Sequence, residues 1–398
     1  MLPELSLGLV ILGITAYAVM GSADFGAGFW DLTAGGAERG GRVRGMVQRS
    51  MSPVWEANHV WLIFVLVIFW TAYPVAFGSV MSTLSLPLFA AAIGVILRGM
   101  AYAMRSGAQP GREMRRVDLL FSLSSILTPF ALGVTVGAIA SGRVPVGNAE
   151  GGLIDSWLHA TPLFAGALGV ATSAYLAAVF LAGDAVRHGD ADMAEAFRRR
   201  ALGAGVVAGA LALAGLPIVH GDARELWDGL TSGAALAAVI GSGAAGAITL
   251  ALLVRRRYEP ARYAAASAVA AVVLGWCLAQ EPFLLPGLSV HEAAADRATL
   301  VAVVLGVVGG MAILLPCLAL LFRLVLGGRF DAPARPPETR SQPSPAPRLW
   351  IPAAMAAAGA PLALFGPPAG EYVGFALLMG AIATGAVALL GPALGEDG

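Results

Sequence analysis

The sequence has no lysine, only two cysteines and few charged residues. All 25 basic residues are arginine, and 25 acidic residues balance them, so the formal net charge is zero. A balanced charge gives no indication of a polyanionic partner such as a nucleic acid. Cys277 and Cys317 both fall within apolar runs. These two residues therefore exclude a disulfide scaffold and a cysteine-based metal motif.

Apolar residues, by contrast, are abundant and lie in long runs. Hydrophobic residues make up 58% of the 398, charged residues only 13%, and the mean hydropathy is +0.76. A run of about 20 apolar residues is long enough to cross a bilayer as an α-helix. The sequence therefore predicts an all-α polytopic membrane protein. Its nine core spans are expected at 5–29, 54–73, 77–103, 117–140, 162–181, 201–217, 232–254, 263–279 and 299–326.

The C-terminal part of the sequence differs from this membrane domain, which is expected over residues 1–328. Residues 329–348 are rich in proline, arginine and serine, a composition typical of a flexible aqueous linker. Residues 349–398 contain two further apolar runs, at 349–365 and 372–390. We expect them to form an additional transmembrane hairpin.

The arginines indicate the orientation of the chain. Of the 25, only Arg143, Arg224 and Arg297 fall in loops that follow even-numbered spans. The remainder follow odd-numbered spans. Positively charged residues remain on the cytoplasmic side of bacterial membranes. We therefore expect a multi-pass protein of the plasma membrane with its N-terminus outside and its linker and C-terminus in the cytoplasm.

The spans contain few ionisable residues, and these converge at one depth. The stretch GSADFGAGFWD places an acid in the inner third of the first span, where an ionisable group is costly unless it faces protein or water. Three further spans bring polar groups to the same level near the cytoplasmic surface. The set consists of Asp24 in the first span, Glu56, Asn58 and His59 in the second, Arg98 in the third, and Asp118, Ser122 and Ser125, which share one face of the fourth.

Two interpretations of this polar level remain open from the residues alone. Glu56 and His59 are three residues apart on a helix, close enough to share a hydrogen bond. Carboxylates, imidazole and hydroxyls can form a proton relay, because each can accept and release a proton. Alternatively, Asp24 or Glu56 neutralises Arg98 in a structural ion pair. His59 could also be a haem ligand, but one histidine beside a glutamate is a weak motif.

At these residues the sequence resembles a known family, subunit II of the cytochrome bd-type quinol oxidases. The resemblance covers Met1 to Gly328 and rests on blocks that occur in the same order. They are GSADFGAG, PVWEANHVWLI, WTAYPVAF, LSLPLF, ILRGMAYAMR, LTPFALGVTVGAIA and the segment from Leu274 to Leu300.

The resemblance implies a fold of two four-helix bundles plus one peripheral helix. It implies pairing with a homologous subunit I that holds haem b and haem d, so that no catalytic residue is expected in this chain, while the residues of any cofactor-binding site in it stay unknown. The complex would oxidise quinol and reduce dioxygen to water with protons from the cytoplasm. The acid of the W-[DE]-x-N motif lines the proton path in this family, and Glu56 is that acid here, which favours the relay. A small accessory subunit and membrane lipid are further expected partners.

The sequence departs from the family pattern at several positions. Gly21 stands where the first of two acids is usual, so Asp24 alone remains, and His59 stands where glutamate or glutamine is common. His59 could supply the missing titratable step. Two functions of other classes also stay open: a secondary transporter, and a structural membrane subunit that conducts no proton. A transporter usually carries its polar site near the midplane, whereas the charges here lie towards one surface.

Overall fold

The computed structural model describes residues 1–35, 37–51, 55–105, 112–326 and 350–365, together with 373 and 377. The chain divides into two compact units, Met1–Leu326 and Gly327–Gly398. The described part of the second unit is mainly α14 (Trp350–Phe365), a helix of 16 residues. The linker expected at 329–348 lies outside the described residues, as does almost all of the span expected at 372–390, so both remain predictions.

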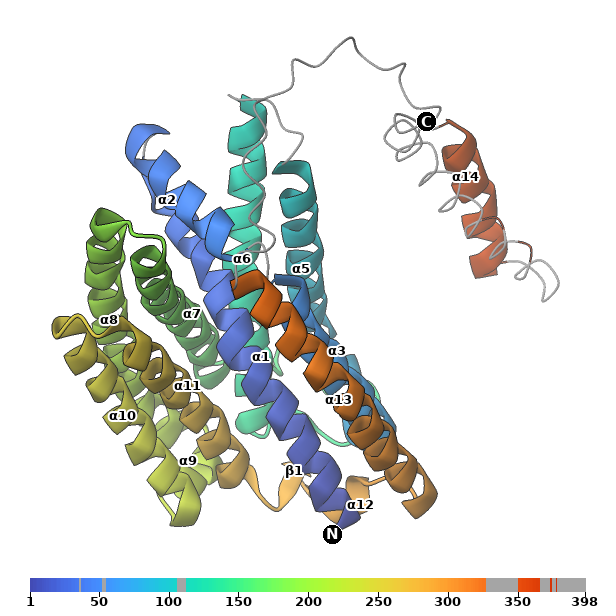
Figure 1. Cartoon of the computed structure of the whole chain (residues 1–398). Helices are drawn as coiled ribbons and strands as arrows, with labels where there is room; N and C mark the ends of the chain where they lie inside the picture. Colours follow the sequence, from blue (N-terminus) through green and yellow to red (C-terminus); the bar gives the residue numbers. More distant parts are fainter. Residues whose placement is uncertain are drawn as a thin grey trace. The chain divides into compact units, whose positions relative to one another are not determined.

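Four helices of the first unit form one bundle, the first bundle (Figure 1). α1 packs against α3 and α6, and α5 packs along α6. A Cβ atom at Gly94 of α5 would lie 2.2 Å from Oγ1 of Thr128 on α6, so the missing side chain lets these two helices approach closely. The four helices are α1 (Leu2–Leu32), α3 (Trp55–Ala72), α5 (Ser85–Arg105) and α6 (Arg112–Ala140).

The span expected at 77–103 is divided into two helices. α4 (Pro74–Thr83) ends before Leu84, and α5 begins immediately after it. Pro87 explains this break, because a proline ring clashes with the carbonyl group four residues earlier, here that of Thr83. The prediction of one continuous helix is therefore wrong. The 21 residues of α5 are nevertheless sufficient to cross a membrane.

Four later helices form the second bundle. α7 packs along α8 and α10 along α11, while α7 also contacts α11 and α8 contacts α10. α10 reads GAALAAVIGSGAAGAITLALLV, and such small residues allow helices to pack closely in a membrane. The four helices are α7 (Ala160–Arg187), α8 (Ala191–Asp222), α10 (Gly233–Val254) and α11 (Tyr258–Gln280).

The two bundles meet along α1, which contacts α7 and α11, and along α6, which contacts α7. Gly26 makes this contact possible, because a Cβ atom there would lie only 1.8 Å from the backbone oxygen of Ser173 on α7. The indole Nε1 of Trp30 donates a hydrogen bond to the backbone oxygen of Ala174 at 2.8 Å. The first unit is thus held together by direct backbone approach as well as by side-chain packing.

The ninth core helix is peripheral. α13 (Arg297–Leu326) packs against α1 and α3 at the side of the first bundle. Among the described residues, eight helices are long and apolar enough to cross a membrane, and a shorter apolar helix at Asn58–Ala72 belongs to α3. The prediction of an all-α polytopic fold with two four-helix bundles and one further helix is confirmed.

Short elements between the spans were not predicted. α2 (Ala37–Met51) follows α1 in a segment expected to be a loop. Its Val43, Met46 and Val47 are buried, and their spacing of three and four residues defines an amphipathic helix. The remaining short elements are α9 (Arg224–Leu230), α12 (Val290–Ala293) and an antiparallel hairpin of β1 (Phe283–Leu285) and β2 (Leu288–Ser289).

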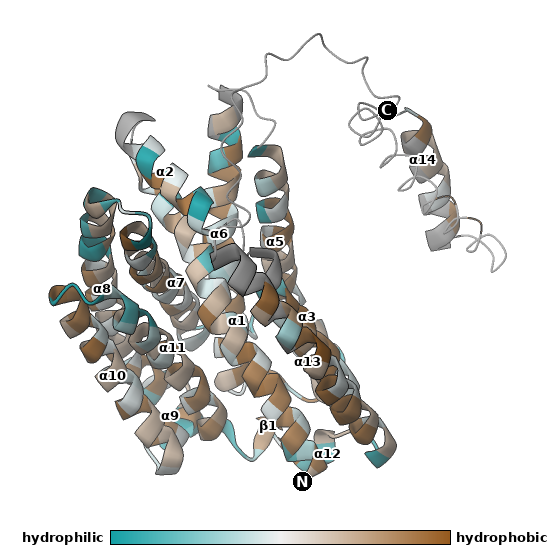
Figure 2. Cartoon of the chain, in the orientation of Figure 1, coloured by the Kyte–Doolittle hydropathy of each residue, from teal (hydrophilic) through white to brown (hydrophobic). Residues whose placement is uncertain are grey.

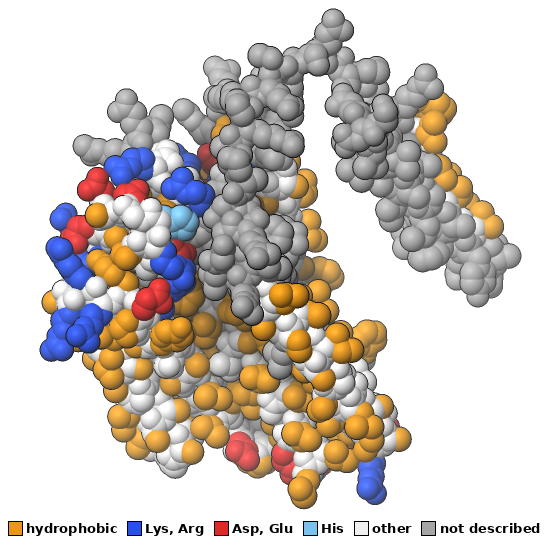
Figure 3. Space-filling model, viewed as in Figure 1, with side chains coloured by type: hydrophobic (Ala, Val, Ile, Leu, Met, Phe, Trp, Pro, Cys, Tyr) orange, Lys and Arg blue, Asp and Glu red, His pale blue; other side chains and the backbone are white. Residues whose placement is uncertain are grey.

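Hydrophilic residues collect at the ends of the helices. The C-terminal ends of α1, α5, α7 and α10 lie at one end of the first unit, which we call the arginine-rich end (Figure 1). Figure 2 shows hydrophilic colour at this end and brown along the middle of the helices. Figure 3 shows arginines and acids gathered over the ends of α8 and its neighbours, above a surface of apolar side chains.

Candidate functional site

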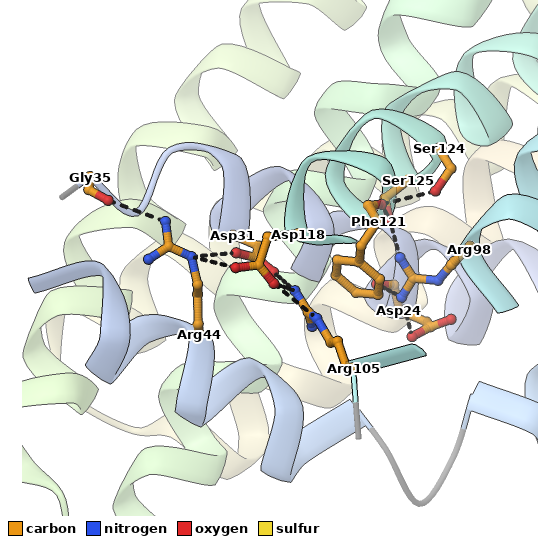
Figure 4. Close-up of polar contacts among 10 residues, drawn as sticks. All are labelled: Asp24, Asp31, Gly35, Arg44, Arg98, Arg105, Asp118, Phe121, Ser124 and Ser125. Carbon is orange, nitrogen blue, oxygen red and sulfur yellow. Dashed lines mark hydrogen bonds and ion pairs between the residues drawn. The ribbon is translucent and has the colours of Figure 1, made fainter. Parts of the chain in front are cut away.

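Three helices of the first bundle carry polar residues in pairs seven residues apart. The pairs are Asp24 and Asp31 on α1, Arg98 and Arg105 on α5, and Asp118 and Ser125 on α6. Seven residues are nearly two helical turns, so each pair lies on one face with its members about 10.5 Å apart along the axis. The three pairs meet as two layers (Figure 4). We call them the buried layer and the rim layer.

The buried layer consists of Asp24, Arg98 and Ser125. Arg98 Nη2 donates to Asp24 Oδ1 at 2.6 Å and to the Asp24 backbone oxygen at 2.8 Å, and Nη1 contacts Ser125 Oγ. The side chains of Arg98 and Asp24 are both fully buried. Gly28 provides the space, because a Cβ atom there would lie 2.3 Å from Ser125 Oγ. One ion pair with a hydroxyl thus joins α1, α5 and α6.

The rim layer lies nearer the arginine-rich end and consists of Asp31, Arg105, Asp118 and Arg44. Arg105 donates to Asp118 Oδ1 from Nη2 at 2.8 Å and from Nε at 3.1 Å, and its Nη2 also binds Asp31. Arg44 of α2 reaches Asp31 at 3.0 Å and Asp118 at 3.8 Å. Two acids and two arginines make this layer neutral.

The two layers differ in their access to water. The side chains of Asp31 and Arg105 are 1% and 6% exposed, whereas those of Asp118 and Arg44 are 21% and 30% exposed. The rim layer therefore meets the solvent at its Asp118 and Arg44 edge. Further inward from this edge, the next polar groups are the fully buried Asp24 and Arg98.

Phe121 of α6 separates the two layers. The guanidinium carbon of Arg98 lies 4.4 Å from the centre of its ring, and that of Arg105 lies 4.2 Å away. A desolvated cation over an aromatic ring contributes about 2 kcal/mol. One buried ring therefore holds both guanidinium groups and keeps the layers distinct.

The predicted residues of α3 lie beside this site with one exception. The side chain of Glu56 lies outside the described part of the structure. Asn58 is buried, and its Nδ2 donates to the backbone oxygen of Met20 on α1 at 3.3 Å. The imidazole of His59 packs edge-on against Tyr17 and Phe25, with ring centres 6.2 and 6.1 Å away. The first turns of α3 are thus docked on α1 close to Asp24.

The residues of α6 divide between the layers. Ser125 belongs to the buried layer and Asp118 to the rim layer, so the two predicted residues do not meet each other. Ser122 is buried on α6 but takes part in none of the contacts of either layer. Arg98 pairs with Asp24 and not, among the described residues, with any other acid.

Asp31, Arg44 and Arg105 are site residues that the sequence analysis missed. The two arginines were assigned to aqueous loops, and Asp31 fell beyond the expected end of the first span. The available signal was the repeated spacing of seven residues. It places Asp31 on the face of Asp24, and Arg105 on the face of Arg98.

The sequence was then compared with known proteins. The family model for cytochrome bd terminal oxidase subunit II matches residues 2–325. The chain belongs to this family. A cytochrome bd subunit II of this kind is part of a haem-containing oxidoreductase complex in a bacterial membrane.

Two relatives of this subunit II give more detail. A putative cytochrome bd menaquinol oxidase subunit II of Bacillus subtilis (strain 168) is 24% identical over 220 residues, which cover 54% of this chain and 61% of that protein. The matched part of the chain thus spans less than two thirds of this relative. The structure of the bd oxidase from Geobacillus thermodenitrificans matches with a TM-score of 0.67 at 24% identity, over 82% of this chain and 99% of that one. This likeness supports the fold.

The ring contacts of His59 in this subunit II are aromatic. Its one histidine within the first bundle, His59, is packed between the aromatic side chains of Tyr17 and Phe25. No group of three His, Cys, Asp or Glu side chains that could hold a metal ion occurs in the part of the chain that the structure describes.

Proposed function

We propose that this chain is the haem-free subunit of a cytochrome bd-type quinol oxidase. It pairs with a haem-bearing subunit I, which oxidises quinol and reduces dioxygen to water. The arginine-rich end faces the cytoplasm, in accordance with the distribution of positive charge in membrane proteins. In this complex the chain supplies structural support and access for cytoplasmic protons through Glu56.

The observation that supports proton access is the arrangement of ionisable groups in the first bundle. They extend from the partly exposed Asp118 at the arginine-rich end to Asp24, which is fully buried. Ionisable residues within a membrane are costly and usually mark a functional path. The arginines of both layers offset the negative charge of the carboxylates, which lets acids remain in the interior.

The position of α3 links Glu56 to these layers. Glu56 lies in the first turn of α3, two residues before Asn58, whose amide is bound to α1 at Met20. Met20 precedes Asp24 by one helical turn. The beginning of α3 is therefore held beside the buried layer, which supports the assignment of proton access to an acid in this turn.

A purely structural role is the second candidate for the same residues. The fully buried pair of Arg98 and Asp24 joins α5 to α1, and a cross-link between helices is what this role requires. In this case the layers hold the helices together and conduct no proton. A transporter is less compatible with the structure, because the charged groups of the two layers lie towards one end of the helices and not at their middle.

The replacement Glu56→Gln separates these candidates. It retains the shape and hydrogen-bonding capacity of the side chain but removes its titratable group. With subunit I co-expressed, we expect haem content and assembly to be unchanged and oxygen consumption with quinol to fall by about tenfold or more. Proton uptake by the enzyme in liposomes should fall in parallel.

The matched control is Asp118→Asn at the solvent edge of the rim layer, where water can replace the lost group. We expect a smaller decrease in turnover. If Glu56→Gln assembles normally and retains full turnover, the proton path is contradicted and the structural role stands. A purified complex without haem or quinol oxidation would favour the transporter instead.

A further inference from the structure

Tyr17 continues the polar face of α1 beyond Asp24. It precedes Asp24 by seven residues, as Asp24 precedes Asp31. Its ring lies along the helix over Gly21, where a Cβ atom would meet ring atoms Cε2, Cδ2 and Cζ at 3.2 to 3.4 Å. Gly21 lies between Tyr17 and Asp24 on this face. The missing side chain at Gly21 therefore lets the tyrosine ring extend towards Asp24.

Two polar atoms on this face lack protein partners. The hydroxyl of Tyr17 and Oδ2 of Asp24 are buried and have no hydrogen-bond partner among the described residues, although Asp24 Oδ1 binds Arg98. Buried polar groups in native proteins are almost always satisfied, and ordered water commonly provides the bond. The hydroxyl can donate and the carboxylate can accept. One water between them would satisfy both atoms.

His59 of α3 lies on the other side of Tyr17. The centres of the two rings are 6.2 Å apart at an interplanar angle of 74°, and Phe25 contacts both. The ring of Tyr17 thus contacts the imidazole on α3 and extends along α1 over Gly21, in the direction of Asp24. Phe25 contributes no polar group, so the hydroxyl of Tyr17 is the group on α1 that can carry a proton between them.

We propose that Tyr17 relays protons between His59 and Asp24 through buried water on either side of its hydroxyl. This inference rests on the proposed function. A first water carries a proton from His59 to the hydroxyl oxygen of Tyr17. As this oxygen accepts it, the hydroxyl releases its own proton to a second water, and the second water passes one to Asp24 Oδ2. The number of protons on Tyr17 is the same before and after, so the tyrosine never has to ionise. Asp24 Oδ1 remains bound to Arg98 throughout.

The replacement Tyr17→Phe tests the relay because it removes only the hydroxyl oxygen. In the complex with subunit I, we expect turnover to fall by about tenfold and the solvent deuterium isotope effect on turnover to rise, because proton transfer becomes limiting. Haem content and thermal unfolding should match the wild type. A merely structural role would not raise the isotope effect. The matched control is Tyr175→Phe, since Tyr175 is another buried tyrosine, in the second bundle, and it should change neither quantity.

A second variant perturbs the ring without removing the hydroxyl. Gly21→Ala places a methyl group against the ring and should lower turnover to an intermediate value. Gly8→Ala on the same helix, where nothing lies within 4 Å, should have no effect. Wild-type turnover and isotope effect in Tyr17→Phe, with Glu56→Gln impaired, would refute the relay and leave the proposed function intact. Wild-type behaviour in both variants would refute both.

Discussion

The two bundles share one architecture but place their charges differently. In the first bundle, Arg98 and Asp24 are fully buried, and the rim layer is only partly open to solvent. In the second bundle, ionic contacts lie at the ends of the helices, as where Asp184 binds Arg187 and Arg262, which are 43% and 18% exposed. The interior of the second bundle consists mainly of alanine, glycine and other small or apolar residues.

This difference separates a functional interior from a supporting one. A buried ion pair is weak support for stability, because removing both ions from water costs about as much as their attraction returns. Close packing of small residues stabilises a membrane bundle without that cost. The first bundle retains charges that packing alone does not require, and this is why we assign proton access to it.

The replacement Arg98→Met has the largest expected effect on this comparison. It would leave Asp24 buried without its cation, which costs about 3–5 kcal/mol of unfolding free energy. The same replacement at Arg262 in the second bundle should cost about 1 kcal/mol or less, because Arg262 is partly exposed. Thermal unfolding of the purified complex measures both. Equal losses would show that the two bundles do not differ in this respect.

The contact between the bundles gives the next largest effect. Gly26→Ala would place a Cβ atom against the backbone of Ser173, and a backbone atom cannot move aside without separating α1 from α7. Overpacking of this kind costs about 1–3 kcal/mol. We expect a lower melting temperature and a smaller yield of complex, with Gly45→Ala in α2 as the control, since nothing lies within 4 Å of Gly45. An unaffected Gly26→Ala variant would mean that the bundles are not held together at this point.

The sequence predicted the membrane fold and part of the site for identifiable reasons. The apolar runs were unmistakable, and ionisable residues were so rare within them that Asp24 and Arg98 could be expected to meet. The rim layer was missed because α1 extends to Leu32, three residues past the apolar run that defined the span. Asp31, the last acid on that helix, was thereby left outside it.

The other differences between the sequence predictions and the structure arise from contacts between residues that are far apart in the sequence. α2 contains three glycines and five charged residues in 15, so its few apolar residues suggested a loop until their burial against α1 and α7 was seen. The ring of Tyr17 could not be placed from the sequence, because its direction depends on the space above Gly21. The local sequence predicts which residues are buried. It predicts less reliably which of the buried residues contact each other.

The ion pair that links α2 to the second bundle should contribute a smaller amount to stability, and this contribution should depend on pH. Asp190 caps α8 by accepting the amide of Met193 at 3.1 Å, and it pairs with Arg42 of α2 at 3.1 Å. The Met193 amide, with a further contribution from Arg42, lowers the pKa of Asp190. A carboxylate with a lowered pKa stabilises the fold above its unfolded pKa of about 3.9, and this contribution is lost as the pH falls through the folded value.

Asp190→Ala should therefore cost about 1 kcal/mol near neutral pH, and its difference from the wild type should diminish below about pH 4. Asp190→Asn should retain most of the cap and lose only the contact with Arg42. Melting temperatures of the three proteins across this pH range measure the effect. A difference that persists unchanged at low pH would assign it to packing and not to the charge of Asp190.

The smallest expected effect is a gain in stability, and it concerns the outer surface of the second bundle. Gly209 lies in α8 with nothing within 4 Å of a Cβ atom built on it, so Gly209→Ala should stabilise the helix by about 0.5–1 kcal/mol. Gly205, one turn earlier, faces Tyr175 and Leu250, and Gly205→Ala should be destabilising. The same change at two adjacent turns thus distinguishes the inner face of α8 from its outer face.

A loss of stability at Gly209 would mean that another surface approaches α8 closely in the assembled complex. The second bundle would then be a contact surface as well as a support, and the simple contrast with the first bundle would have to be revised.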